Sequence, residues 1–107
     1  MAVHVFRYQE GDTVSCIYWG YVYDADADTK TLTDSDASYP TITITDSAGT
    51  EKVSAAAMTK TSTGKYVYYY TIPTTGPTGW WSVKVNNQIT SGAVVRSEVS
   101  HGGFSVD

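Results

Sequence analysis

The stretch KYVYYYTI, from Lys65 to Ile72, decides the fold of this chain, and it lies between a Thr-Gly pair and Pro73. β-Branched and aromatic residues that alternate with a period of two, bounded by glycine and proline, are typical of a β-strand. The alternation places Tyr66, Tyr68, Tyr70 and Ile72 on one face and Val67, Tyr69 and Thr71 on the other. Because both faces carry large side chains, we expect a central strand with one face in the core.

Other segments on both sides of this stretch alternate in the same way. Strands are expected over residues 2–8 at a sheet edge, 13–23, 39–46, 51–54, 80–86 and 93–106. Short strands with turn signals between them are typical of two packed antiparallel sheets. The sequence therefore predicts an all-β sandwich of two antiparallel sheets and about seven strands.

Several local features refine this prediction. In the strand over residues 80–86, Trp81 is expected to point inward and Trp80 outward. Gly20 lies inside an expected strand, where a glycine indicates a bulge or the close approach of another backbone. Residues 55–60 predict a brief strand or a single helical turn, residues 87–92 predict a turn, and the last strand is expected to break near Gly102-Gly103.

Length and composition limit the class of protein. A chain of 107 residues with 41% hydrophobic and 17% charged residues fits a single globular domain over residues 1–107. A net charge of −4 argues against binding to nucleic acids. The single cysteine excludes an internal disulfide and a cysteine-based zinc site. No apolar run of membrane-spanning length and no signal peptide is present, so we expect a cytoplasmic product or a piece of a larger exported protein.

Several motifs together resemble a known group of domains. They are GDTV (11–14), TITITDSAG (41–49), MTKTSTGKYVYYYTIP (58–73), GWWSVKV (79–85) and the closing FSV (104–106). Over nearly the whole chain they resemble immunoglobulin-like β-sandwich domains, which occur in bacterial and archaeal surface proteins and as small stand-alone proteins of phages and prophages. The chain departs from the classical pattern because Cys16 has no disulfide partner and a long loop follows Tyr23.

The resemblance implies a role in structure or adhesion and brings no catalytic residues. We expect a non-catalytic interaction module, such as a capsid-decoration or head–tail protein of a phage virion or a surface adhesion domain. Its partner would be another protein or further copies of itself. It would lie in the virion or host cytoplasm if a phage encodes it, and otherwise at the cell surface within a larger protein. No Gly-x-Ser-x-Gly elbow or glycine-rich phosphate loop suggests an enzyme.

Aromatic residues make up 13% of the chain, which is more than a core of this size needs. The candidate binding set is Trp19, Tyr21, Tyr23, Tyr69 and Trp80. These side chains could form a platform for sugar rings, with Asn87 or Gln88 bound to hydroxyl groups. They would equally suit a protein interface, in which Trp and Tyr are common hot spots. A third interpretation is that they pack the second face of the sandwich.

The loop DADADTKTLTDSD, from Asp24 to Asp36, is rich in carboxylates. Asp24, Asp26 and Asp28 alternate in a way that could wrap one Ca²⁺ ion, which prefers oxygen ligands. The loop lacks the turn glycine and the closing glutamate of an EF-hand, so a solvated polar loop is the alternative. No other cofactor is expected.

His4, His101 and Cys16 are the remaining residues with metal-binding or nucleophilic chemistry. Terminal strands of a sandwich can be neighbours, which would bring the two histidines together, but no carboxylate accompanies them. We expect solvated histidines. Cys16 is expected to be a small buried hydrophobic residue.

Overall fold

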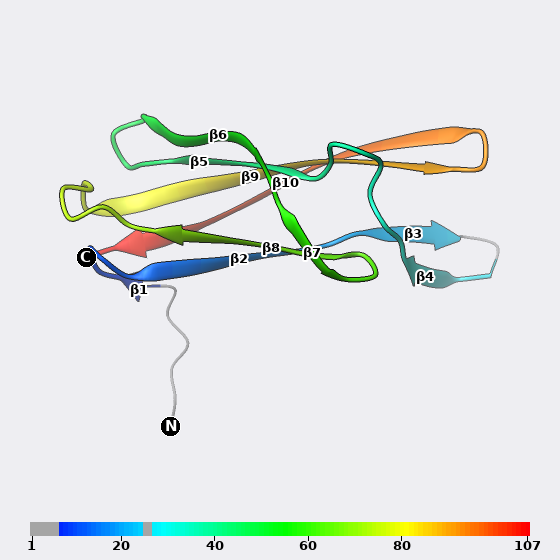
Figure 1. Cartoon of the computed structure of the whole chain (residues 1–107), viewed down its shortest axis with the longest axis horizontal. Helices are drawn as coiled ribbons and strands as arrows, with labels where there is room; N and C mark the ends of the chain where they lie inside the picture. The colour runs from blue at the N-terminus through cyan, green and yellow to red at the C-terminus, as the bar shows by residue number, and fades with distance from the viewer. Residues whose placement is uncertain (1–6, 25–26) are drawn as a thin grey trace, which may run out of the picture.

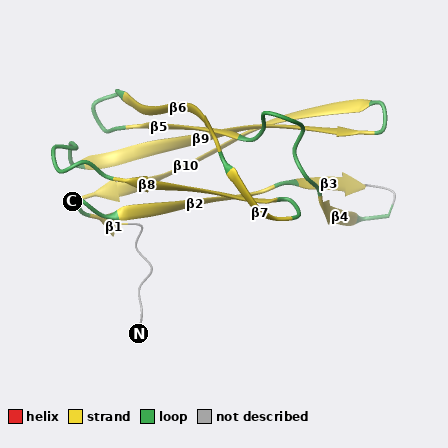
Figure 2. Ribbon diagram, in the orientation of Figure 1, coloured by secondary structure: helices red, strands yellow, loops and turns green. Residues whose placement is uncertain are grey.

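The structure, a computed structural model, describes residues 7–24 and 27–107, and within these residues it contains strands and turns but no helix. In chain order the strands are β1 (Arg7–Tyr8), β2 (Thr13–Trp19), β3 (Tyr21–Asp24), β4 (Thr29–Leu32), β5 (Thr41–Thr45), β6 (Glu51–Ala57), β7 (Thr59–Ser62), β8 (Lys65–Thr71), β9 (Gly79–Ser91) and β10 (Val94–Val106). They form a five-stranded sheet in the order β1-β10-β9-β5-β6, a three-stranded sheet in the order β2-β8-β7 and the two-stranded sheet β3-β4 (Figures 1 and 2).

Strand β8 lies between β2 and β7, which confirms the central position predicted from its two large faces. Tyr66 is buried on the inner face, opposite Tyr18 of β2, whereas Tyr69 on the outer face is exposed. Val67 also belongs to the outer face but is only 7% exposed. Its neighbours in register are Ile17 of β2 and Thr59 of β7, which cover it from both sides.

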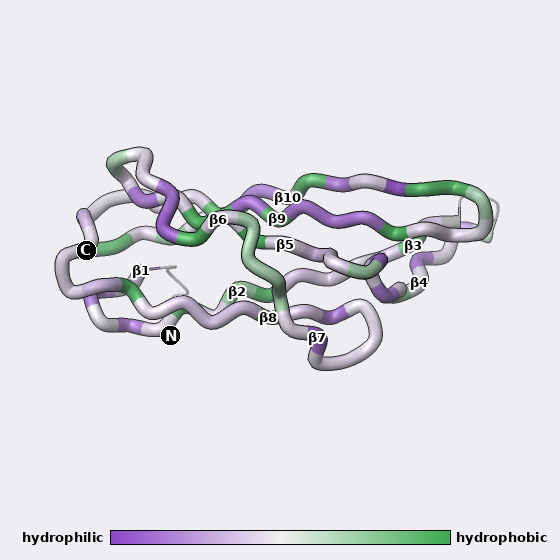
Figure 3. Tube along the Cα trace, turned by 45° about the horizontal axis from the view of Figure 1, so that its top comes forward, coloured by the Kyte–Doolittle hydropathy of each residue, from purple (hydrophilic) through white to green (hydrophobic). Residues whose placement is uncertain are grey.

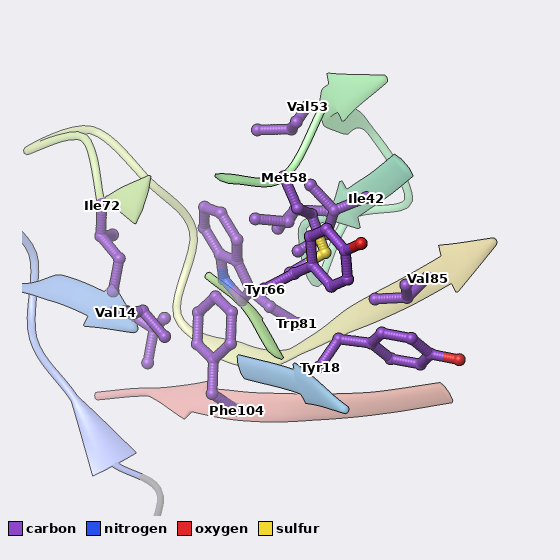
Figure 4. Close-up of a cluster of buried hydrophobic side chains, with 12 residues drawn as sticks. Val14, Tyr18, Ile42, Val53, Met58, Tyr66, Ile72, Trp81, Val85 and Phe104 are labelled. Atoms are coloured by element: carbon purple, nitrogen blue, oxygen red, sulfur yellow. The ribbon is translucent and has the colours of Figure 1, made fainter. Parts of the chain in front are cut away.

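One hydrophobic core joins the five-stranded sheet to the three-stranded sheet, which gives the domain a sandwich-like architecture (Figure 4). Trp81 is completely buried at its centre, and its ring centroid lies 5.7 Å from that of Phe104. The Trp81 indole Nε1 donates a hydrogen bond to Pro77 O at 2.9 Å, so its polar atom is satisfied. Trp80 points away from the core, and the predicted orientation of the two tryptophans is confirmed.

The strand count and the sheet arrangement differ from the prediction. Within the described residues, ten strands in three sheets replace about seven in two, and one pairing is parallel, because Arg7 and Tyr8 of β1 lie beside Ser105 and Val106 of β10. The described part of the first expected strand is thus an edge strand, as predicted; residues 2–6 lie outside the described residues.

Gly20 accounts for one of the additional strands. It divides the strand expected over residues 13–23 into β2 and β3, and its carbonyl oxygen accepts a hydrogen bond from Thr33 N at 3.0 Å. A Cβ atom at this position would lie 3.1 Å from Thr33 O. The close backbone approach expected from this glycine is therefore confirmed.

The alternative of a helical turn over residues 55–60 is wrong. Strand β6 continues through Ala57 and β7 begins at Thr59. Ala56 faces Ile42 across the β5–β6 ladder, and Met58 between the two strands is buried. Pairing with β5 and burial of Met58 outweigh the helix preference of three consecutive alanines.

The turn predicted over residues 87–92 is also wrong, as is the break near Gly102-Gly103. Strand β9 continues to Ser91, β10 runs unbroken from Val94, and only Gly92 and Ala93 form the turn between them. Because the β5–β9 ladder ends at Asn86, the far part of the β9–β10 ladder extends beyond β5. We call residues 87–98 the hairpin arm.

The hairpin arm lies over the β3–β4 hairpin at one end of the molecule (Figure 1), and hydrophobic stretches run along its β10 strand (Figure 3). The loop after β4 binds the edge of the hairpin arm through Asp36. The Asp36 carboxylate accepts hydrogen bonds from Thr90 N at 2.9 Å and Thr90 Oγ1 at 2.6 Å, and Asp36 N donates to Gln88 O at 2.8 Å. This loop replaces β5 as the neighbour of β9.

Candidate functional site

All five aromatic residues predicted as a binding set are exposed, so none of them fills the core. Their exposed fractions are 43% for Trp19, 47% for Tyr21, 50% for Tyr23, 65% for Tyr69 and 59% for Trp80. The structure nevertheless distributes them over three separate places: the outer face of the three-stranded sheet, the outer face of the five-stranded sheet, and the space beneath the hairpin arm.

Trp19 and Tyr69 share the outer face of the three-stranded sheet with Ile17, which is 54% exposed. Register pairs Ile17 with Val67 and Trp19 with Lys65, so these side chains form one continuous surface across β2 and β8. The Lys65 ammonium lies 5.0 Å from the centroid of the Trp19 ring, a cation–π distance. We call Ile17, Trp19, Val67 and Tyr69 the β2–β8 face.

Trp80 lies on the other side of the sandwich. Its neighbour in sequence, Trp81, points into the core, and Trp80 therefore projects from the outer face of the five-stranded sheet. A Cβ atom at Gly103 of β10 would collide with the Trp80 ring, so the indole packs directly on the glycine backbone. Trp80 cannot share a flat platform with Trp19 and Tyr69.

Tyr21 and Tyr23 border a cavity of about 250 Å³ between the β3–β4 hairpin and the hairpin arm. The opposite wall is formed by Asn87, Ile89, Arg96 and Glu98. We call it the hairpin cavity. The structure thus brings Asn87, one of the amides predicted to assist the aromatic set, next to two of the five aromatic residues.

A hydrogen-bonded group of three side chains lies where the hairpin arm leaves the sandwich. The Tyr18 hydroxyl donates to a Glu98 carboxylate oxygen and accepts from Asn87 Nδ2 at 3.2 Å. Burial, and then the hydrogen bond to Glu98, raise the pKa of the Tyr18 phenol well above its ordinary value. Tyr18 therefore remains neutral and acts as a fixed donor.

Sequence reasoning missed Arg96 and Glu98, because a turn at residues 87–92 would leave no strand residues opposite them. The register of the continuous β9–β10 ladder sets Arg96 opposite Ile89 and Glu98 opposite Asn87. Val83, Val85 and Ile89 occupy alternate positions around Asn87, and this alternation was the sequence signal that the strand continues.

The acidic loop contains a strand and several specific contacts. Strand β4 lies within it, and Tyr23 OH donates to Asp28 Oδ1 at 2.6 Å. Asp34 accepts from Lys60 Nζ at 2.6 Å and from Gly64 N at 2.9 Å, and these hydrogen bonds, that of Lys60 first, lower the pKa of its carboxyl group. The expected loop thus contains a strand, while its residues 27–32 are exposed, as in a solvated polar segment.

The calcium prediction rests on Asp24, Asp26 and Asp28. Asp26 and the Asp24 side chain lie outside what the structure describes, so the ion site stays a prediction. Among the described residues, no three side chains of His, Cys, Asp or Glu are grouped closely enough to hold a metal ion.

Cys16 is half-buried and packs against the core, as predicted for a small hydrophobic residue, and burial raises the pKa of its thiol. His101 is exposed on β10, and His4 lies outside the described residues. Within the described part of the chain, no helix has the length and apolar character needed to cross a membrane.

The fold matches part of a larger known structure. No protein-family profile and no curated protein sequence matches the chain. The crystal structure of a DUF4785 family protein from Legionella pneumophila superposes with a TM-score of 0.70 at 17% sequence identity, over 95% of this chain and 26% of that one. The chain thus spans about a quarter of that protein and is an all-β domain whose fold matches part of it.

Proposed function

We propose that this chain is an immunoglobulin-like, non-catalytic interaction module that binds another protein, or a further copy of itself, through the β2–β8 face. Such a module would serve as a structural component of a phage virion, in capsid decoration or at the head–tail junction, or as an adhesion domain at a cell surface. The observation that carries the proposal is the exposure of Ile17, Trp19 and Tyr69 around Val67 on one continuous surface.

The chemistry of this face suits a protein interface. Large exposed apolar patches are rare on proteins that act alone, and Trp and Tyr dominate the binding energy of many interfaces. Because β2 is the last strand on its side of the three-stranded sheet, a partner can approach the face and the strand edge together. Lys65 beside Trp19 adds a cation at the rim, where charged residues are typical.

Site-specific photo-crosslinking tests the proposal in the native particle or cell. A photoreactive amino acid replaces Tyr69 on the β2–β8 face and, as a matched control, Lys84, which is exposed on the outer face of the five-stranded sheet. We expect a protein adduct from position 69 and none from position 84. Light scattering on purified protein distinguishes self-assembly, which gives a whole-number multiple of the chain mass. The absence of any adduct at position 69 would contradict the proposal.

Carbohydrate binding is the alternative function. The separation of Trp80 from Trp19 and Tyr69 removes the flat five-ring platform, and the alternative then depends on Tyr21 and Tyr23. The observation that favours it is the hairpin cavity, in which these two rings lie beside hydrogen-bonding side chains.

A further inference from the structure

The side chain of Asn87, which lines the hairpin cavity, is only 3% exposed. Its Nδ2 donates to Tyr18 OH, and its buried Oδ1 accepts no hydrogen bond within the described residues. Rotating the amide by half a turn would exchange the two atoms and leave the nitrogen unpaired instead. Buried side-chain polar atoms nearly always have a hydrogen-bond partner. A hydrogen-bond donor at the wall that Asn87 lines would therefore be stabilising.

The same wall offers both a hydrogen-bond donor and a hydrogen-bond acceptor. Arg96 and Glu98 are two residues apart and lie on the same face of β10, toward the β3–β4 hairpin. Glu98 accepts one hydrogen bond from Tyr18 and keeps further acceptor capacity. The Arg96 guanidinium, which forms no ion pair within the described residues, supplies several donors. Ile89 adds an apolar side chain to this wall.

Two aromatic rings line the cavity from the other hairpin, and neighbouring side chains contact both rings. The Tyr23 hydroxyl is bound to Asp28 at 2.6 Å. The Lys30 ammonium lies 5.9 Å from the centroid of the Tyr21 ring. The cavity therefore has aromatic surfaces on one side and hydrogen-bond donors and acceptors on the other.

We propose that the hairpin cavity binds one neutral sugar residue, such as the terminal hexopyranose of a glycan. A pyranose presents an apolar C–H face for a tyrosine ring, and each of its hydroxyl groups both donates and accepts. Hydroxyls can therefore donate to Glu98 and accept from Arg96. A small anion would meet the Glu98 carboxylate and a small cation the Arg96 guanidinium, so the wall favours an uncharged polar ligand.

This inference gives the carbohydrate alternative its site and ligand class, and it does not depend on the β2–β8 face. Methyl hexopyranosides of glucose, galactose and mannose are titrated into ¹⁵N-labelled protein, with the corresponding glucuronide as a charged comparison. We expect saturable amide shifts around Tyr21 and Arg96 with at least one neutral sugar, at a Kd of about 1 mM. Arg96→Ala should weaken this binding about tenfold or more. Lys84→Ala, which removes a cation from the other side of the sandwich, should leave it unchanged.

The outcomes separate this inference from the proposed protein interface. No saturable shift with any neutral sugar, equal binding by the Arg96→Ala protein, or binding of the glucuronide alone would overturn it. Shifts confined to Trp19 and Tyr69 would also overturn it. None of these results alters the crosslink expected at position 69, and loss of that crosslink leaves the sugar titration unaffected. The dispersion of the amide spectrum shows that each variant is folded.

Discussion

The indole of Trp80 packs on the backbone of Gly103, in the space that any side chain at residue 103 would occupy. A Cβ atom there would collide with the ring and would lie 2.5 Å from Trp81 O, which belongs to the paired strand. Gly103→Ala is therefore expected to lower the free energy of unfolding by about 1–3 kcal/mol, the range typical of overpacking.

Urea denaturation followed by tryptophan fluorescence measures this effect, and the adjacent glycine provides the control. A Cβ atom at Gly102 would meet nothing within 4 Å, so Gly102→Ala should leave the stability nearly unchanged. Equal losses in the two variants would show that the packing of Trp80 on Gly103 is not the cause.

The Tyr18 hydroxyl links the hairpin arm to the core, because it contacts both Asn87 and Glu98. In Tyr18→Phe the buried Asn87 amide loses its remaining partner, and we expect the free energy of unfolding to fall by about 1–3 kcal/mol. Tyr69→Phe removes a hydroxyl from a side chain that is 65% exposed and should change it by less than about 0.5 kcal/mol. Chemical denaturation compares the two variants, and a stability of Tyr18→Phe equal to that of the wild type would refute the linking role.

Asp46 makes the free energy of unfolding depend on pH in the acidic range. Hydrogen bonds from Thr50 N and Ala48 N, each 2.9 Å long, hold the pKa of its carboxyl group below the ordinary value of 3.8. A carboxylate with a lowered folded pKa stabilises the fold above its unfolded pKa, and this contribution is lost as the pH falls through the folded pKa. Asp46→Asn should therefore be less stable than the wild type at pH 7, and the difference should shrink below pH 3.8. Denaturation midpoints across this range test the trend, which a constant difference would contradict.

Asp36 holds the hairpin arm by its two hydrogen bonds to Thr90. In Asp36→Ala the backbone amide of Thr90 becomes free to exchange, whereas amides of β8 in the core should keep their protection. Hydrogen–deuterium exchange, resolved by residue, measures both regions in one experiment. Uniform loss of protection would mean that the loop stabilises the whole domain rather than the arm.

Much of the fold follows from local patterns that a single sequence displays. The alternation in KYVYYYTI identified β8 and its inner face, and the pair Trp80-Trp81 was oriented correctly because only one side of β9 faces the core. Gly20 marked a real close approach, since a Cβ atom there would lie only 3.1 Å from Thr33 O. In each case the type of residue at a position indicates how much space surrounds its side chain.

The failures occurred where distant partners override local preference. A turn was predicted over residues 87–92, but Asn87 is buried and hydrogen-bonded to Tyr18 from another sheet. Gly102-Gly103 resembles a break, yet the second glycine serves the packing of Trp80. The hairpin cavity was hidden for the same reason, because Arg96 lines the same cavity as Tyr21 only through the register of a continuous β9–β10 ladder.

The hydrogen bond from Asp107 N to Tyr8 O, 2.8 Å long, joins the two ends of the described chain at one pole of the molecule. The tip of the hairpin arm lies at the opposite pole (Figure 1). A scaffold attached through residue 7 or residue 107 would therefore hold the domain at the end opposite the tip of the hairpin arm. The hairpin cavity would then face away from the scaffold, which would not block access to it.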